Sequence, residues 1–112
     1  MVKSEKSDGY TICTFDQTTK LNAVNSEEVK AEINRHFNNP GTKLILDLGN
    51  IDFIDSSGFG VLLSVMKNAK NNSGTFVICC IKPNVLALFK LLQLHNIFHL
   101  HDNLEEAKQS VD

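Results

Sequence analysis

The segment Leu44–Gly60, LILDLGNIDFIDSSGFG, predicts a buried strand, a polar turn and the start of a helix. Its first five residues, Leu44 to Leu48, carry apolar side chains on both alternating faces. An exposed antiparallel strand does not tolerate that pattern, whereas a strand covered by helices on both sides requires it. From Ser56 or Ser57 the spacing of apolar residues becomes helical. The segment therefore predicts a central strand followed by a helix.

The chain before this segment predicts two strands, a loop and a helix. Alternating β-branched and aromatic residues over Tyr10–Phe15 indicate a strand, with a shorter one over Val2–Lys6. Asp16–Asn25 is polar and is interpreted as a loop. Ser26 is the expected N-cap of a helix with acidic residues in its first turn, and that helix ends before Pro40.

The chain after this segment repeats the alternation of strand and helix. Thr75–Ile81 predicts a second strand that is apolar on both faces, and Pro83 suits the first turn of a helix. A short strand is expected over Ile97–Leu100, and Asn103 is the expected cap of a last helix. The fold class is therefore α/β: residues 1–112 form a single domain with a mixed β-sheet, βαβ crossovers and about four helices.

Composition excludes several classes of function. The chain has 112 residues, and 11 Lys and Arg against 13 Asp and Glu give a net charge of −2. This balance argues against general nucleic-acid binding, which needs clustered cations. No apolar run approaches the roughly 18 to 20 residues of a membrane span, and the start lacks the apolar core of a secretory signal. The expected location is the cytoplasm, with no membrane insertion.

The turn at Asp55-Ser56-Ser57-Gly58 is the strongest candidate for a functional site. It should lie at the carboxyl edge of the sheet, where ligands and partners commonly bind open α/β sheets. A phosphoryl group on Ser56 or Ser57 would be stabilised there by the free N–H groups of a helix start. The alternative is that Asp55 and the serines only cap the helix.

The histidines and acids near the sheet edge do not indicate a metal site. His95, His99 and His101 have no cysteine or carboxylate at a spacing that completes a zinc set, so surface positions are expected. The acids of the turn region are interpreted as turn and cap residues rather than as a magnesium site; they are Asp47, Asp52 and Asp55.

The three cysteines, Cys13, Cys79 and Cys80, are an odd set without metal-ligand spacing. They are interpreted as reduced and buried small hydrophobic residues. No metal and no cofactor is predicted.

Catalysis by a serine nucleophile is not expected. The serine turn is not Gly-x-Ser-x-Gly, and no acid is placed to orient a histidine. The motif Gly58-Phe59-Gly60 is too short to indicate a nucleotide-binding loop. Its glycines are expected to let the backbone approach a neighbouring segment closely at the start of the helix. Phe53 and Phe59 flank the turn, and each is either a core residue or an exposed anchor for a partner; a core position is favoured for both. The chain is therefore predicted not to be an enzyme.

The segment Leu44–Gly60 closely resembles the signature of the STAS domain found in anti-sigma factor antagonists. Members of that family have an apolar strand that ends in Asp-Leu, then an apolar-apolar-Asp-Ser-Ser-Gly-apolar-Gly turn into a helix. Asp47-Leu48 and Ile54–Gly60 match every element. The order of predicted strands and helices also fits the family over nearly the full chain.

The resemblance implies a phosphorylation switch. A partner that is both an anti-sigma factor and a serine kinase would modify the first serine, Ser56, and Ser57 would be the structural cap. The unphosphorylated chain would bind that partner and free a sigma factor, and a separate Ser/Thr phosphatase would reverse the modification. The partner-binding turn comprises Asp55, Ser56, Ser57 and Gly58, together with Asn22.

Asn22 is the one departure from the family pattern. Family antagonists often carry Leu-Asp where this chain has Leu21-Asn22, which removes a charge beside the switch serine. A second interpretation keeps the fold without the switch: a scaffold subunit of a lipid-transport or stress-signalling complex, in which Asp55-Ser56-Ser57 only caps a helix.

Overall fold

A five-stranded mixed sheet is the centre of the computed structural model, which describes residues 1–112. The two N-terminal strands form an antiparallel hairpin, and every other neighbouring pair in the sheet is parallel. In spatial order the strands are β1 (Val2–Ser7), β2 (Tyr10–Phe15), β4 (Lys43–Asp47), β6 (Thr75–Cys79) and β7 (His99–His101). The mixed sheet with parallel crossovers that the sequence predicts is confirmed.

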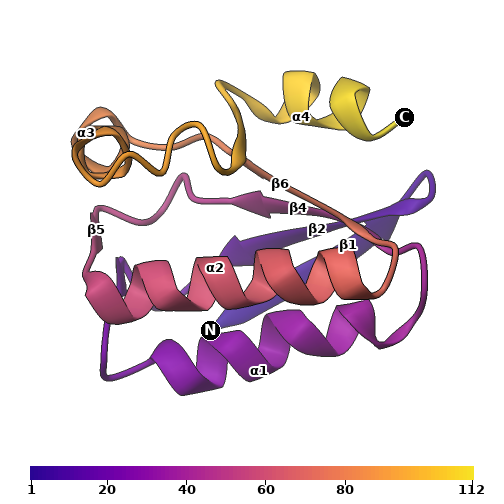
Figure 1. Ribbon diagram of the computed structural model, residues 1–112, viewed down its shortest axis with the longest axis horizontal. Coiled ribbons are helices and arrows are strands. Elements are labelled where there is room, and N and C mark those ends of the chain that lie inside the picture. Colours follow the sequence, from indigo (N-terminus) through magenta and orange to yellow (C-terminus); the bar gives the residue numbers. More distant parts are fainter.

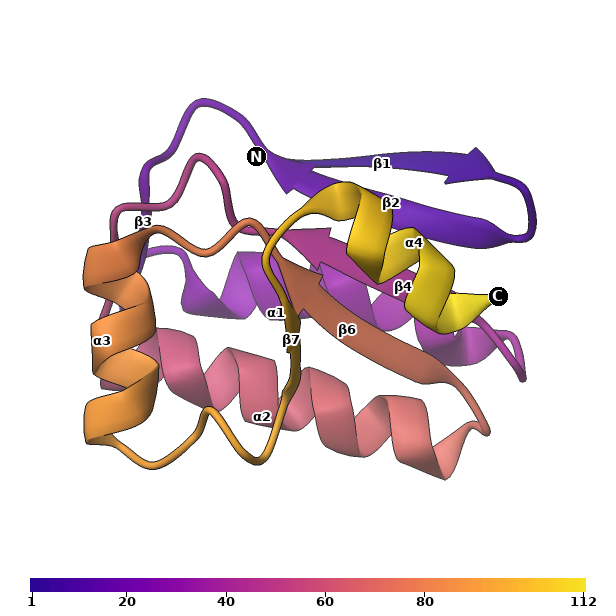
Figure 2. The same cartoon turned by 90° about the horizontal axis from the view of Figure 1, so that it is seen from above.

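Helices cover both faces of this sheet. Two helices, α1 (Ser26–Asn34) and α2 (Ser56–Asn71), lie side by side on one face, and α4 (Leu104–Val111) lies alone on the other (Figures 1 and 2). A short 3₁₀ helix, η1 (Arg35–Asn38), extends α1, and α3 (Pro83–Leu91) lies at the end of the sheet where α2 begins. The four predicted helices are therefore all present.

The apolar core lies in two layers, one on each side of the sheet. Leu44 and Leu46 of β4 contribute to the larger layer beneath α1 and α2, whereas Ile45 between them contributes to the smaller layer beneath α4. This division explains why the central strands are apolar on both faces. Aromatic rings join α2, α3 and the segment before β7, because Phe89 packs edge-to-face on Phe59 at 5.0 Å and on Phe98 at 5.8 Å.

Several boundaries differ from the sequence predictions. Ser26 is not the N-cap of α1: Asn25 occupies that position, and its side chain makes no capping hydrogen bond. The last strand begins at His99 rather than at Ile97. Two segments predicted as loops contain two-residue strands, β3 (Lys20–Leu21) and β5 (Phe53–Ile54), which pair in parallel outside the main sheet. Such short strands are stabilised by their pairing and leave no periodic pattern in the sequence.

No helix of the chain combines the length and the apolar composition that crossing a membrane requires.

Candidate functional site

The pairing of β3 with β5 fixes the position at which α2 begins. Leu21 lies opposite Ile54 in the register of the two strands. The backbone N–H of Asp55 donates to the carbonyl of Leu21 at 3.1 Å, and that of Asp52 donates to the carbonyl of Thr19 at 2.8 Å. The loop before α1 and the turn before α2 are therefore held together, although they are about thirty residues apart in the chain.

Asp55 caps α2. It has an extended backbone immediately before the helix, and its Oδ1 accepts a hydrogen bond from the N–H of Gly58 at 3.0 Å. Its Oδ2 accepts from the N–H of Ala23 at 3.2 Å, so the same carboxylate also holds the loop before α1. The prediction that Ser57 is the cap is wrong, because Ser57 is already the second residue of the helix. The predicted cap role of Asp55 is confirmed.

Ser56 is the first residue of α2 and its side chain is exposed. Neither its hydroxyl nor that of the half-buried Ser57 makes a hydrogen bond within the chain. The N–H groups of these two residues belong to the first turn, which has no carbonyl partners within the helix. The positive end of the helix dipole favours an anion at this place. The Ser56 hydroxyl is therefore accessible and lies in a field that stabilises a phosphoryl group.

Gly58 permits the close approach between α2 and β3. A Cβ at this position would overlap the carbonyl oxygen of Leu21 and would come within 2.7 Å of Ile54 Cγ2. The predicted close approach of the backbone is thus confirmed for Gly58. Gly60 differs, since a Cβ there meets no atom within 4 Å and the position faces solvent.

Asn22 lies in the loop that Asp55 holds. Its Oδ1 accepts from the N–H of Val24 at 3.0 Å, and its own N–H donates to Asn25 Oδ1 at 3.0 Å. Because Asp55 Oδ2 binds the neighbouring Ala23, the fold places Asn22 beside the serine turn. Asn22 precedes α1 in the chain and the Asp55–Gly58 turn follows it, and the fold brings the two segments together.

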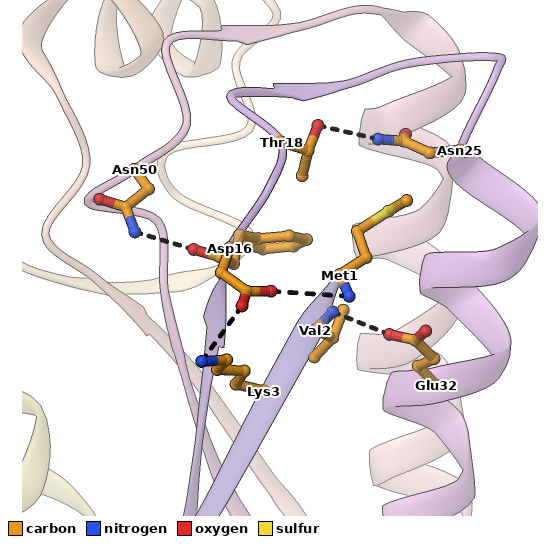
Figure 3. A network of polar contacts seen from close by, with 9 residues as sticks. Met1, Val2, Lys3, Asp16, Thr18, Asn25, Glu32 and Asn50 are labelled. Atoms are coloured by element: carbon orange, nitrogen blue, oxygen red, sulfur yellow. Dashed lines mark hydrogen bonds and ion pairs between the residues drawn. The ribbon is translucent and has the colours of Figure 1, made fainter.

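Asn25 organises this loop and was not recognised from the sequence. Its side chain is buried, and Nδ2 donates to the carbonyl of Lys20 at 2.8 Å. The same nitrogen donates to Thr18 Oγ1 at 3.4 Å (Figure 3). Asn25 Oδ1 accepts from the N–H of Asn22, so both the oxygen and the nitrogen of the side-chain amide have hydrogen-bond partners. An asparagine directly before a predicted helix is the only sequence signal, and it indicates a cap rather than a loop anchor.

Two large apolar side chains are exposed around the serine turn. Val24 is 93% exposed in the loop before α1, and Phe53 is 45% exposed in β5. Phe59 is 5% exposed and belongs to the core, so the prediction of a core position is confirmed for Phe59 and wrong for Phe53. Phe53 faces outward because β5 pairs on one side only and alternates its side chains between core and solvent.

A hollow of about 770 Å³ lies next to this surface and is lined by the β2–α1 loop, Asn50 and Lys82. Ion pairs fix its rim: Asp16 lies 3.2 Å from Lys3 Nζ and 3.6 Å from the Met1 amine (Figure 3). The hydrogen bond from Lys3 lowers the pKa of the Asp16 carboxyl. The hollow thus extends the polar surface beside Val24.

The remaining acids and histidines are not brought to the turn as a cluster. Asp47 Oδ1 accepts from the N–H of Gly49 at 2.7 Å, which confirms its turn role. Asp52 is exposed, and its carbonyl accepts from Asn84 Nδ2 at 2.7 Å. The one group of potential metal ligands comprises Asp47, Cys79 and Cys80, and it includes none of the histidines.

Comparisons with known proteins agree with this architecture. BtrV of Bordetella bronchiseptica, a proposed anti-sigma factor antagonist, is 31% identical over 103 residues, which cover 92% of this chain and 87% of BtrV. An anti-sigma-factor antagonist (STAS) domain protein from Planctomyces limnophilus has a solved structure with a TM-score of 0.89 at 17% identity, covering 98% of this chain and 97% of that chain. The phosphorylated form of the Bacillus cell fate determinant SpoIIAA has a TM-score of 0.71 at 19% identity, covering 100% of both chains.

A family model described as the STAS domain matches residues 2–107. The match spans the hairpin, the central strands, the Asp-Ser-Ser-Gly turn and the first half of α4. This chain belongs to the STAS domain family.

Proposed function

We propose that this chain is an anti-sigma factor antagonist that acts in the cytoplasm by binding an anti-sigma factor through the surface around the start of α2. Binding of the unphosphorylated form frees a sigma factor, and phosphorylation of Ser56 releases the anti-sigma factor. The role is that of a binding protein rather than an enzyme. The relative named as an antagonist and the likeness to the phosphorylated form of SpoIIAA support this proposal.

The observation that carries the proposal is the contrast between Ser56 and the residues around it. The Asp55 carboxylate accepts two backbone hydrogen bonds that hold the fold together. Gly58 packs closely against β3. The Ser56 side chain is exposed and makes no hydrogen bond within the chain. A modification of its hydroxyl therefore changes the surface and leaves the packing of α2 unchanged.

The switch acts through electrostatics and desolvation. Phosphate adds about −1.5 to −2 charges and three strong acceptors. It stands beside the carboxylate of Asp55 and near the exposed Asp52, so the turn becomes strongly acidic. When a partner covers the phosphate, the phosphate loses its hydration, which lowers the binding affinity. Repulsion from acidic groups on the partner lowers the affinity further. A loss of several kcal/mol of binding free energy follows without any rearrangement of the domain.

The exposed apolar residues provide the attractive part of the interface. Phe53 lies in β5, which pairs with β3, and Val24 follows Ala23, whose N–H binds Asp55. Removal of apolar surface from water is the dominant favourable contribution to the free energy of most protein–protein association. Asn22 leaves this region without the acid that family antagonists often carry, so a kinase that recognises this chain does so without that charge.

A phosphorylation assay tests the proposal. The chain is incubated with the anti-sigma factor kinase that coprecipitates with it from its native cells and with ATP, and phosphopeptides are located by mass spectrometry. We expect one phosphate, on Ser56, and no incorporation into Ser56→Ala. Ser57→Ala is the matched control, and it should accept phosphate at the rate of the wild type.

Label on Ser57, or equal incorporation into Ser56→Ala and the wild type, contradicts the assignment. A chain that coprecipitates only with transporter subunits and carries no phosphate supports the non-switching scaffold instead. A Ser/Thr phosphatase that removes the label from Ser56 and restores binding completes the cycle.

A further inference from the structure

The parallel register of β4 and β6 places Asp47 directly opposite Cys79 at the carboxyl edge of the sheet. Cys80 follows, and its Sγ lies 3.5 Å from the Sγ of Cys79. One carboxylate oxygen of Asp47 and the two sulfur atoms all lie within 4.8 Å of one another. Thirty-two residues of chain separate Asp47 from Cys79, so this group is a product of the fold.

The backbone of Cys80 explains how two adjacent cysteines face the same side. Successive side chains of a regular strand point to opposite faces. β6 ends at Cys79, and Cys80 has a φ of +64°, in the left-handed region that a residue with a Cβ seldom occupies. Both side chains pack against the smaller core layer beneath α4. A hydrogen bond from the Cys80 N–H to the carbonyl of His101, at 3.3 Å, holds this turn.

The donor set suits a thiophilic divalent cation. Two thiolates at Zn–S bonds of about 2.3 Å in tetrahedral geometry stand about 3.8 Å apart, close to the separation of the two sulfur atoms here. Asp47 Oδ1 is oriented by the N–H of Gly49, at 2.7 Å, and such orientation of a ligand by a backbone donor is typical of metal sites. Three protein ligands leave the fourth tetrahedral position to water or to a further ligand.

We propose that Asp47, Cys79 and Cys80 form a binding site for one thiophilic divalent cation, of which Zn²⁺ is the physiological representative. Binding forms two metal–sulfur bonds and one metal–oxygen bond, and the two thiol protons leave to solvent. The site is separate from the Ser56 turn and does not depend on the proposed phosphorylation.

Burial keeps both groups as thiols when no cation is bound. Desolvation raises the pKa of the Cys79 thiol, which is fully buried, and also that of the half-buried Cys80 thiol. A bound cation therefore displaces both thiol protons. Cys80 is the side from which the cation enters, because it is the cysteine with exposed surface.

Titration of the reduced chain with Cd²⁺, a spectroscopic probe for thiolate ligands, tests the site. We expect the ultraviolet charge-transfer band of cadmium thiolate to saturate at one equivalent, with two protons released per cation. Zn²⁺ should displace the probe, compete with a chromogenic chelator and raise the melting temperature of the chain.

Variants identify the ligands. Cys80→Ser and Cys79→Ser should each lower affinity roughly tenfold or more and remove about half of the charge-transfer absorbance, and Asp47→Asn should weaken binding with the absorbance retained. Cys13→Ser is the matched control, since Cys13 is buried in the other core layer and should not affect binding. If the Cys79→Ser chain does not fold, the affinity and the absorbance of Cys80→Ser alone test whether the cysteines are ligands.

Failure of the wild type to bind either cation in the micromolar range overturns the proposal. Unchanged affinity in Cys80→Ser, or loss of binding in a Cys13→Ser chain that keeps its fold by circular dichroism, overturns it equally. These outcomes leave the assignment of Ser56 untouched, because phosphate incorporation is measured independently.

Discussion

Asp55 and Ser56 are adjacent residues with opposite relations to the rest of the chain. Both carboxylate oxygens of Asp55 accept backbone hydrogen bonds, one from α2 and one from the loop before α1. Ser56 makes no side-chain hydrogen bond and faces solvent. Stability and the proposed signalling role therefore depend on different side chains, and substitutions can separate them.

Replacement of the cap should lower stability more than replacement of the second serine. Asp55→Ala removes the acceptor for Gly58 and frees the loop at Ala23, and loss of an N-cap costs about 0.5–2 kcal/mol. Ser57→Ala should stay within about 0.5 kcal/mol of the wild type. Urea unfolding midpoints measure both. A larger loss in Ser57→Ala than in Asp55→Ala would return the cap role to Ser57.

Truncation of the exposed apolar residues should weaken partner binding and leave the fold stable. Val24→Ala and Phe53→Ala each remove an exposed anchor beside the serine turn, and we expect losses of about 1 kcal/mol or more in binding free energy. Leu91→Ala is the matched control, because Leu91 is 77% exposed and is the last residue of α3, at the opposite end of that helix from Asn84, which binds the carbonyl of Asp52. Unchanged binding in Val24→Ala and Phe53→Ala would place the interface elsewhere, and an equal loss in Leu91→Ala would show that the effect is not specific to the surface beside the serine turn.

At the scale of elements, the two glycines of α2 have different reasons to be glycine. Gly58 lies against β3, so Gly58→Ala forces the helix start away from Leu21 and should cost about 1–3 kcal/mol of stability. Gly60 faces solvent with no neighbour, so Gly60→Ala should raise stability by up to about 1 kcal/mol through helix propensity. Thermal and urea unfolding of the pair measure this difference. A stable Gly58→Ala protein would mean that β3 and α2 are not in contact.

The long elements could be predicted from the sequence because each has its own pattern. The apolar strands β4 and β6 and the amphipathic helices α1, α2 and α4 emerge from periodicity and from the capping residue Asn103. The strands β3 and β5 could not be predicted, since two residues carry no period and their pairing is a tertiary contact. The role of Asn25 in holding the loop before α1 could not be predicted either, because the folded loop alone brings Thr18 and Lys20 to its side chain.

The serine turn could be located from its motif, but the roles within it could not all be assigned. Asp55 and Ser57 are both good caps, and a shift of one or two residues in the helix start decides between them. The sequence predicts the cysteines only as reduced and buried residues, because the register that joins Asp47 to Cys79 depends on the crossover between β4 and β6. The spacing of residues in the sequence therefore does not predict a site whose members are brought together by strand pairing.

At the scale of the whole molecule, the sheet is a rigid support and the serine turn lies at its carboxyl edge. α1 and α2 pack on one face, α4 packs on the other, and the turn emerges where β4 passes into α2 (Figure 1). A charge added to this edge alters the surface without reaching either core layer. The proposed switch therefore requires no change of fold.

Stability of the whole domain should fall as the pH drops below about 6.5 because of His36 in η1. Burial, and to a lesser extent Arg35 and Lys6, lowers the pKa of the His36 imidazole below its ordinary value. The folded chain then binds fewer protons than the unfolded chain in this window, so stability is lost on acidification. Unfolding midpoints from pH 7.5 to 5.5 should show a smaller decrease in His36→Gln.

Arg35→Gln is the control for this prediction. It keeps the imidazole and its burial, which is the larger cause of the lowered pKa, so most of the pH dependence should remain. A pH dependence identical in His36→Gln and in the wild type would remove His36 as the cause.

The central claim is that Ser56 gates the binding of an anti-sigma factor, and calorimetric titration against the purified anti-sigma partner tests it most directly. Wild type and Ser56→Ala should bind with equal affinity, authentic phosphoprotein roughly a hundredfold more weakly or worse, and Ser56→Asp in between, because aspartate has one charge and fewer acceptors. None of the four proteins should lose more than about 0.5 kcal/mol of stability, since the site is exposed. Equal affinity of all four proteins would contradict the account and would favour the non-switching scaffold.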